Sequence, residues 1–327
     1  MSIFIAVPGY QDTEFIPTIE DAFAKADNPQ DVYIGSRYLS THNDELDNLE
    51  EWVNNHKYSD NISIQLTLVD EHNRFEVFGS TKGRQGAANF YADQDYFLSI
   101  DSHCLFGDHW DTELIRLHKE AKELTQNDKT IITAYGASYA FNNIGERYFT
   151  TNHYYQYIGF PKESPSVVEY NWMTRPLYSV CLPWMCEEIS SNYPDLLPAT
   201  KFAYNFSFSD QCFIYDEDLD VYIIEEDMIK TWKLIKDGWT FVHPNTRNAL
   251  IGHLYNTEIN KYGIRASVVN SIEKETEWKY VQQEVRNVLK YLYDEEYKEV
   301  ISKYQSWLKV DYKKHSLHNW YMPDSFI

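Results

Sequence analysis

The residues with the clearest chemical potential are Asp101 and His103, which stand one residue apart after the apolar run Tyr96 to Ile100. That run has the aromatic and branched composition of a buried strand. In an open α/β sheet, ligands bind beyond the carboxyl ends of the strands, so these two side chains are well placed to hold a divalent cation against a phosphate. The structural alternative is that Asp101 caps a turn and His103 packs near Trp110.

A second candidate segment, Lys82 to Ala88, reads Lys-Gly-Arg-Gln-Gly-Ala-Ala and is expected to open the helix that leads into this strand. Free backbone N–H groups at a helix start, together with the guanidinium of Arg84, suit a phosphate. The spacing is neither a Walker A loop nor Gly-x-Gly-x-x-Gly. An ordinary solvated helix start is the alternative interpretation.

Two further groups of polar residues follow apolar runs later in the chain. Glu225, Glu226 and Asp227 come after residues 221–224 and precede a predicted helix. They could favour the helix N-terminus, or they could bind sugar hydroxyls, because a carboxylate accepts two hydrogen bonds side by side. His253 stands alone after apolar residues, where a histidine is either a satisfied core residue or a ligand.

The elements that must position these residues alternate along the first half of the chain. Apolar runs and helical periodicity predict strands at 2–7, 32–36, 62–69 and 96–100, with helices at 12–26, 42–56 and 82–93. Such alternation predicts an α/β fold whose mainly parallel sheet carries helices on both faces. Later patterns predict strands at 129–135, 202–215 and 239–242, and helices at 226–238, 273–293 and 295–307.

Composition restricts the class of protein. The 327 residues include 43% hydrophobic and 16% aromatic residues, enough for a sizeable core. The formal net charge of −21 repels polyanions, which argues against nucleic-acid binding. The four cysteines form no Cys-x-x-Cys pair and are expected to be reduced. Because no stretch approaches the ~20 apolar residues of a membrane span, we expect a protein of the cytoplasm, or of the host cytoplasm if it is viral.

The order of several short motifs resembles that of a known family. The chain has Ile3 to Asp12, Ile16 to Ile19, Ala24 to Ala26, Asn28-Pro29, Arg84, Ile100 to His103, Trp110-Asp111, Glu225-Glu226, Gly238-Trp239, His243 to Asn245 and His253 to Tyr255. Across roughly residues 3 to 256, this ordered set resembles the polypeptide N-acetylglucosaminyltransferases that modify Skp1-type hydroxyproline.

The resemblance implies a GT-A glycosyltransferase fold, in which a Rossmann-like nucleotide half and an acceptor half share one mixed, mainly parallel sheet. The expected boundaries are about 1–111 for the nucleotide half, 112–270 for the acceptor half and 271–327 for a helical C-terminal extension. The implied reaction moves a sugar from a nucleotide sugar, foremost a UDP-sugar resembling UDP-GlcNAc, to a hydroxyl group with retention of configuration. The departures at Ile224 and at the end of the strand 34–38 leave the sugar open.

The resemblance also implies roles for particular residues. The implied ligands of Mn²⁺, or less favourably Mg²⁺, are Asp101, His103 and His253. The implied contacts to the donor nucleotide are Pro8, Gly9, Tyr10, Arg84 and Ser102. Glu225 and Glu226 are assigned to the donor sugar or the acceptor hydroxyl, and no covalent carboxylate nucleophile is identified.

The acceptor is the least defined part. Residues 136–200 show little periodicity and are predicted to form loops over the donor site, with aromatic acceptor surfaces at Tyr139, Tyr154, Tyr155, Trp172 and Trp184. The alternative is a poorly patterned but well-packed layer. If the basic residues Arg147, Lys162, Arg175 and Lys201 converged, a hydroxymethylated base in phage DNA could be the acceptor. If they are scattered, or paired with Glu146, Glu163 and Glu169, a protein or small-molecule hydroxyl is favoured. A non-catalytic nucleotide- or glycan-binding module is the alternative from another class.

Overall fold

The structure is a computed structural model that describes residues 1–69, 80–153, 156–159, 178–181, 194–214, 226–246, 248–255, 291, 293–311, 316–317 and 325–327. Its first half contains β1 (Ile3–Ala6), β2 (Gly9–Tyr10), α1 (Phe15–Lys25), β3 (Val32–Ser40), α2 (Asn43–Asn55), β4 (Ile62–Leu68), α4 (Ser80–Ala88) and β5 (Tyr96–Ile100). These elements confirm the predicted alternation of strands and helices.

The second half contributes further strands and three helices to the described part of the chain. They are β6 (Cys104–Phe106), α5 (Trp110–Thr125), β7 (Thr130–Thr133), β8 (Ala137–Phe141), β9 (Arg147–Phe149), β10 (Gln156–Gly159), β11 (Tyr178–Cys181), β12 (Leu196–Pro198), β13 (Phe206–Ser209), α7 (Glu226–Lys236), β14 (Thr240–Pro244), β15 (Ile251–His253), α10 (Lys298–Leu308), β16 (Val310–Asp311) and β17 (Ser316–Leu317).

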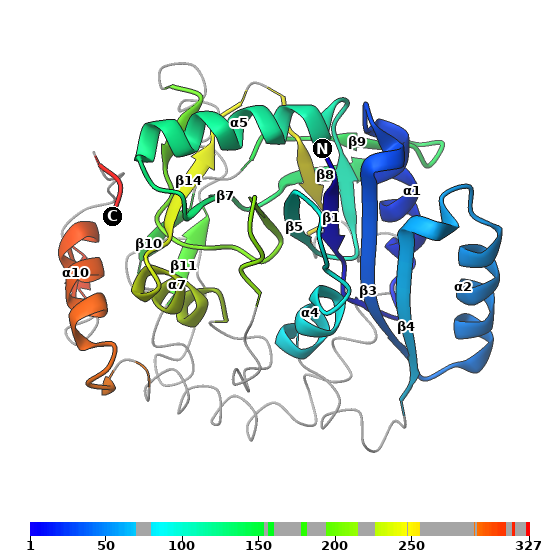
Figure 1. The fold of residues 1–327 in the computed structure, drawn as a ribbon, viewed down its shortest axis with the longest axis horizontal. Coiled ribbons are helices and arrows are strands. Elements are labelled where there is room, and N and C mark those ends of the chain that lie inside the picture. Colours follow the sequence, from blue (N-terminus) through cyan, green and yellow to red (C-terminus); the bar gives the residue numbers. More distant parts are fainter. Residues whose placement is uncertain are drawn as a thin grey trace.

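A nine-stranded sheet joins the two halves in the order β12-β14-β7-β13-β5-β1-β3-β2, with β4 also paired to β3. The strands β5, β1, β3 and β4 pair in parallel, as do β7 and β14. The strand β13 runs antiparallel to both β5 and β7 and so connects the two parallel groups. The predicted mixed, mainly parallel sheet is therefore confirmed (Figure 1).

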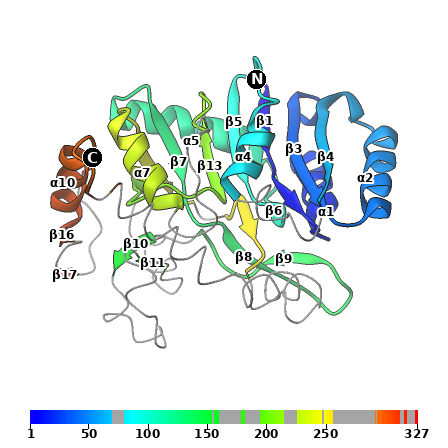
Figure 2. The same cartoon turned by 90° about the horizontal axis from the view of Figure 1, so that it is seen from below.

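Both faces of this sheet are buried, as the continuous apolar strands predict. Alternate residues of β1 enter different cores: Ile3 and Ile5 pack in the cluster that contains residues of α1, α2 and α5. Phe4 packs in the cluster that contains residues of α4 and α7. Figure 2 shows α4 and α7 on the near side of the sheet and α5 behind it. The helices thus sandwich the sheet and leave the carboxyl ends of its strands to form a site.

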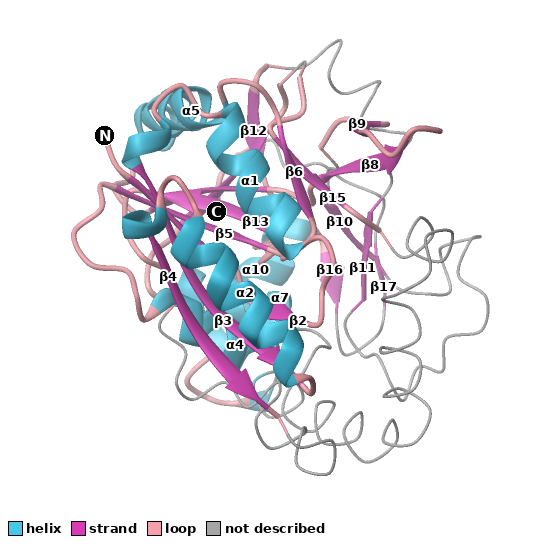
Figure 3. Cartoon of the chain, turned by 90° about the vertical axis from the view of Figure 1, so that its right-hand side faces the viewer, coloured by secondary structure: helices cyan, strands magenta, loops and turns pink. Residues whose placement is uncertain are grey.

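A second, four-stranded sheet has the order β6-β15-β8-β9. Figure 3 shows these strands set off to one side of the larger sheet. Glycines permit their close packing: a Cβ on Gly107 would lie 2.3 Å from the carbonyl oxygen of Ala249, and a Cβ on Gly252 would lie 2.8 Å from the ring of Phe149. The prediction of loops throughout 136–200 is therefore wrong for the described residues of that segment, which include β8 to β12.

The C-terminal extension is described only in part. The predicted helix at 295–307 corresponds to α10, whose Ile301 and Tyr304 pack with Met228 and Trp232 of α7. Most of the predicted helix at 273–293 lies outside the described residues. Among the residues that the structure describes, no helix is long and apolar enough to cross a membrane.

Candidate metal and donor site

Asp101 directly follows β5, at the carboxyl end of the central strand, and the chain turns immediately into β6. Thr18 of α1 holds this turn: its hydroxyl lies 3.0 Å from the carbonyl oxygens of Ser102 and Cys104 and 2.8 Å from the backbone nitrogen of Cys104. Thr18 is fully buried, so this anchor is shielded from water. The turn therefore fixes where the side chains of Asp101 and His103 start.

His253 reaches the same place through strand pairing. β15 runs antiparallel to β6 with His253 opposite Cys104, and the backbone nitrogen of Leu254 donates to the carbonyl oxygen of His103 at 3.0 Å. On its other side, β15 pairs with β8. A Cβ on Gly136 would lie 3.0 Å from the Cβ of His253, so glycine there leaves room for the histidine. The register of β15 thus sets His253 beside a residue 150 positions earlier in the chain.

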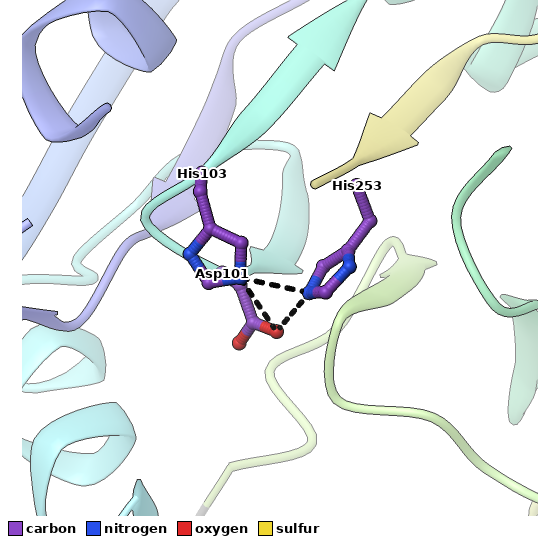
Figure 4. A group of neighbouring side chains, drawn as sticks. All are labelled: Asp101, His103 and His253. Carbon is purple, nitrogen blue, oxygen red and sulfur yellow. Dashed lines mark hydrogen bonds and ion pairs between the residues drawn. The ribbon is translucent and has the colours of Figure 1, made fainter. Parts of the chain in front are cut away.

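The three side chains converge, as Figure 4 shows. His253 Nε2 lies 2.9 Å from Asp101 Oδ2 and 2.9 Å from His103 Nε2, and the remaining pair, His103 Nε2 and Asp101 Oδ2, is 4.0 Å apart. Their ligand atoms all lie within 4.8 Å of one another. Two ligands at right angles around an ion at about 2.1 Å lie about 3 Å apart, so the spacing and the mixed oxygen and imidazole donors fit a divalent cation. His253 is therefore not isolated in the fold but lies beside Asp101 and His103.

The charge of Asp101 is maintained by Arg84. Arg84 is buried, and its Nη2 lies 2.7 Å from Asp101 Oδ1 and 3.7 Å from Glu226 Oε1. Burial would raise the pKa of Asp101, but the guanidinium and the hydrogen bond with His253 hold that pKa well below its usual value. The Asp101 carboxyl is thus ionised at neutral pH.

A second carboxylate, Asp12, lies behind His103. Asp12 Oδ2 is 3.0 Å from His103 Nδ1 and accepts a hydrogen bond of 2.6 Å from the Ser102 hydroxyl. Asp12 Oδ1 accepts from the backbone nitrogen of Glu14 at 3.0 Å. All three side chains of this group, Asp12, Ser102 and His103, are buried. Nothing in the local sequence connects Asp12 with residue 103, so this contact is visible only in the structure.

Comparison with known proteins identifies the family. Residues 63–317 match the glycosyltransferase (GlcNAc) family, which covers more than half of the chain. The chain belongs to this family. The match extends beyond residue 256, where the recognisable motifs end, and it does not include the N-terminal motifs before residue 63. It also does not distinguish the Skp1-type enzymes from the rest of the family. No match was found among curated proteins.

The solved structure of GalNAc-T7 supports the fold of this glycosyltransferase-family chain. GalNAc-T7 with UDP, GalNAc and Mn²⁺ has a TM-score of 0.51 at 9% identity, and the match covers 78% of this chain and 44% of that one. The chain therefore spans less than half the length of that relative. S. aureus TarS 1–349 gives a TM-score of 0.40 at 13% identity, covering 96% of this chain and 77% of that one. The architecture is that of the GT-A glycosyltransferases.

Several residues that are expected to contact the donor nucleotide lie at one edge of the sheet. Pro8, Gly9 and Tyr10 follow β1, and Gly9 and Tyr10 pair with β3. A Cβ on Gly9 would lie 2.2 Å from the ring of Tyr38, so only glycine fits there. Because β1 and β5 are parallel neighbours, this segment and Ser102 leave the sheet at the same edge. The Ser102 hydroxyl already donates a hydrogen bond to Asp12.

Arg84 and Tyr139 lie elsewhere than the sequence indicated, whereas Glu226 stands at a helix start as expected. Arg84 is not at a helix start: α4 already includes Ser80, so the guanidinium projects from inside the helix toward Asp101. Glu226 begins α7 and meets the site through Arg84, whereas Glu225 lies outside the described residues. Tyr139 is fully buried and its hydroxyl contacts Glu14, so it offers no acceptor surface. The other four aromatic candidates also lie outside the described residues.

An ion pair beside Glu226, between Lys201 and Asp227, was not predicted from the sequence. Lys201 Nζ lies 3.1 Å from Asp227 Oδ2, and Asp227 Oδ1 accepts from the backbone nitrogen of Tyr204. The ring of Tyr204 in turn lies under the guanidinium of Arg84, 4.7 Å from its centroid. This chain of contacts ties the start of α7 to Arg84 and Asp101, and no local pattern of residues signals it.

Proposed function

We propose that this chain is a metal-dependent glycosyltransferase that moves a sugar from a nucleotide sugar to a hydroxyl acceptor, with retention of configuration. The observation that carries the proposal is the convergence of Asp101, His103 and His253, whose ligand atoms lie within 4.8 Å of one another at the carboxyl edge of the sheet. Family membership supports the reaction class. The UDP and Mn²⁺ in the structure of GalNAc-T7 support a UDP-sugar donor and manganese.

The two halves of the fold are proposed to supply different residues of the site. The nucleotide half, about 1–111, supplies Asp101 and His103, and the acceptor half, about 112–270, supplies His253 and Glu226. When bound, a divalent cation would stabilise the negative charge that develops on the diphosphate leaving group. Arg84 keeps Asp101 ionised and oriented by the contact at 2.7 Å. Pro8, Gly9, Tyr10 and Ser102 are proposed to line the nucleotide pocket.

Glu226 is the proposed contact to the donor sugar or to the acceptor hydroxyl. It stands at the first position of α7 and is largely buried, and its Oε1 lies 3.7 Å from Arg84. A carboxylate at a helix start beside a guanidinium can accept two hydrogen bonds side by side. Glu225 shares the proposed role on the strength of the family resemblance alone. Neither glutamate is proposed as a covalent nucleophile.

The acceptor proposed is a protein or small-molecule hydroxyl, with a Skp1-type hydroxylated polypeptide as the first to test. Two of the four basic residues considered for a DNA acceptor are described, and both are paired with acids. Arg147 lies 3.6 Å from Glu14 and 3.5 Å from Asp21, and Lys201 pairs with Asp227. Their charges are therefore neutralised locally, and the net charge of −21 repels a phosphate backbone.

The test is a panel of UDP-, GDP- and CMP-sugars, each measured with and without Mn²⁺ for binding and for slow release of the nucleotide. The expected result is metal-dependent binding and turnover of one class of donor, both lost in Asp101→Asn. Metal-dependent binding without any turnover would instead indicate a non-catalytic module. Binding of a nucleotide sugar that depends neither on the metal nor on Asp101 would overturn the proposed site.

A further inference from the structure

Asp12 stands on the far side of the His103 ring from Asp101 and His253. Its Oδ2 lies 3.0 Å from Nδ1 of His103, whereas Nε2 of the same ring lies 2.9 Å from Nε2 of His253. An ionised carboxylate can only accept hydrogen bonds, so the ring nitrogen beside it must carry the proton. The other nitrogen, Nε2, is then left with a lone pair directed at Asp101 and His253.

We propose that Asp12 is a positioning residue that fixes His103 in the Nδ1–H tautomer and so prepares its Nε2 to ligate the cation. The inference rests on the proposed metal-dependent function and adds the residue that sets the affinity for the metal. A carboxylate partner orients an imidazole ligand and raises its basicity, and its loss costs about 10–100-fold in metal affinity in known sites. Asp12 is not itself a candidate ligand, because its oxygen faces the opposite ring nitrogen.

The surroundings of Asp12 make it rigid. Asp12 is 6% exposed and His103 is 3% exposed, so water cannot readily replace their contact. The Ser102 hydroxyl donates to the same Oδ2 at 2.6 Å, and the backbone nitrogen of Glu14 donates to Oδ1 at 3.0 Å. The backbone nitrogen of Asp12 also donates to the hydroxyl of Tyr38 at 3.0 Å. Both carboxylate oxygens therefore have fixed directions before any ligand arrives.

His253 provides the contrast. Its Nδ1 is buried and has no hydrogen-bond partner among the residues that the structure describes, so none of these residues fixes its tautomer from behind. Its Nε2 lies 2.9 Å from Asp101 Oδ2, a contact that favours a proton on Nε2 when no cation is bound. Of the two imidazoles, His103 is prepared for the metal and His253 must shift its proton when it ligates.

The substitution Asp12→Asn tests the tautomer directly. An amide has one acceptor oxygen where the carboxylate had two, and the backbone nitrogen of Glu14 cannot become an acceptor, whereas an imidazole and a hydroxyl can. The amide is therefore expected to turn its oxygen toward Glu14 and its NH₂ toward Ser102 and His103. That orientation forces the proton of His103 onto Nε2, the nitrogen that must bind the metal.

The experiment titrates the chain with Mn²⁺ alone and follows the histidine tautomers by ¹⁵N NMR, with the His103 signals assigned from their loss in His103→Gln. The unsubstituted chain should show the Nδ1–H tautomer at His103, and Asp12→Asn should show the Nε2–H tautomer and bind Mn²⁺ about 10–100-fold more weakly. Asp111→Asn is the matched control: Asp111 is equally buried and accepts from the backbone nitrogens of Asp27 and Asn28, away from the site. It should retain the affinity for Mn²⁺.

Three outcomes would overturn the inference. Equal Mn²⁺ affinities for the unsubstituted chain and Asp12→Asn would reject it and leave the proposed function standing. An Nε2–H tautomer at His103 in the unsubstituted chain would also reject it, and that measurement needs no substituted protein. Absence of Mn²⁺ binding by the unsubstituted chain would reject the metal-dependent function and this inference together.

Discussion

Replacing Arg84 with methionine tests whether the buried charges around Asp101 depend on one cation. The guanidinium contacts Asp101 at 2.7 Å, Glu226 at 3.7 Å and the carbonyl oxygen of Tyr204 at 3.3 Å, and the side chain is 7% exposed. Methionine fills most of the same volume but leaves two carboxylates without their counterion. Removing one partner of a buried pair costs about 3–5 kcal/mol. Because Asp101 is 20% exposed and keeps His253, we expect a loss near the lower limit, about 3 kcal/mol.

The assay is urea unfolding at neutral pH, in which the loss appears as a lower midpoint at an unchanged slope. Arg116→Met is the control, because Arg116 makes similar ion pairs with Glu113 and Glu120 but is 43% exposed, so its removal should cost at most about 1 kcal/mol. Adding Asp101→Asn to Arg84→Met should recover part of the loss. If the two arginine variants lost equal stability, or the second substitution recovered nothing, the reasoning from buried charge would be refuted.

Three more predictions concern the site and its support. His253→Ala removes one of three ligands, so the Mn²⁺ titration should weaken strongly while the unfolding midpoint changes little. Glu226→Gln is nearly isosteric, so turnover should fall while nucleotide affinity is largely kept, and loss of folding would instead favour a purely structural role. Burial lowers the pKa of His153 to about 4 and of His243 to about 3, whereas an exposed histidine in the unfolded chain has a pKa of 6.5. As the pH falls below 6.5, the unfolded chain therefore becomes protonated at these histidines while the folded chain does not. Stability should therefore fall by about 2 kcal/mol per histidine between pH 7 and 5, measured by urea unfolding at both values.

The first half of the fold could be predicted because its signals are local. Continuous apolar runs at β1 and β5 and helical periodicity in α1 and α2 report buried strands and amphipathic helices directly. The location of Asp101 at a strand end follows from the abrupt change after Ile100. Arg84 shows the limit of such signals, since its glycine-rich surroundings resemble a helix start although α4 already includes Ser80.

The rest of the site could not be predicted because it depends on pairings between distant segments. Apart from the family resemblance, His253 becomes a candidate ligand only when β15 is inserted between β6 and β8 in a register that places it opposite Cys104. A shift by one residue would turn its side chain to the other face of the sheet. Asp12 likewise becomes relevant only because α1 packs beneath the turn after β5, where Thr18 anchors Ser102. Neither fact leaves a pattern along the sequence.

The charges of the site give a physical reason for the proposed dependence on a metal. Arg84 is the guanidinium partner of Asp101 and Glu226, Asp12 lies behind His103, and Lys201 is paired with Asp227. Asp101, Glu226 and Arg84 together leave one formal negative charge in the site, in a chain whose net charge is already −21. A bound divalent cation would cancel that local charge and remove the repulsion. For the proposed site, these charges predict that the cation binds before the nucleotide sugar or together with it.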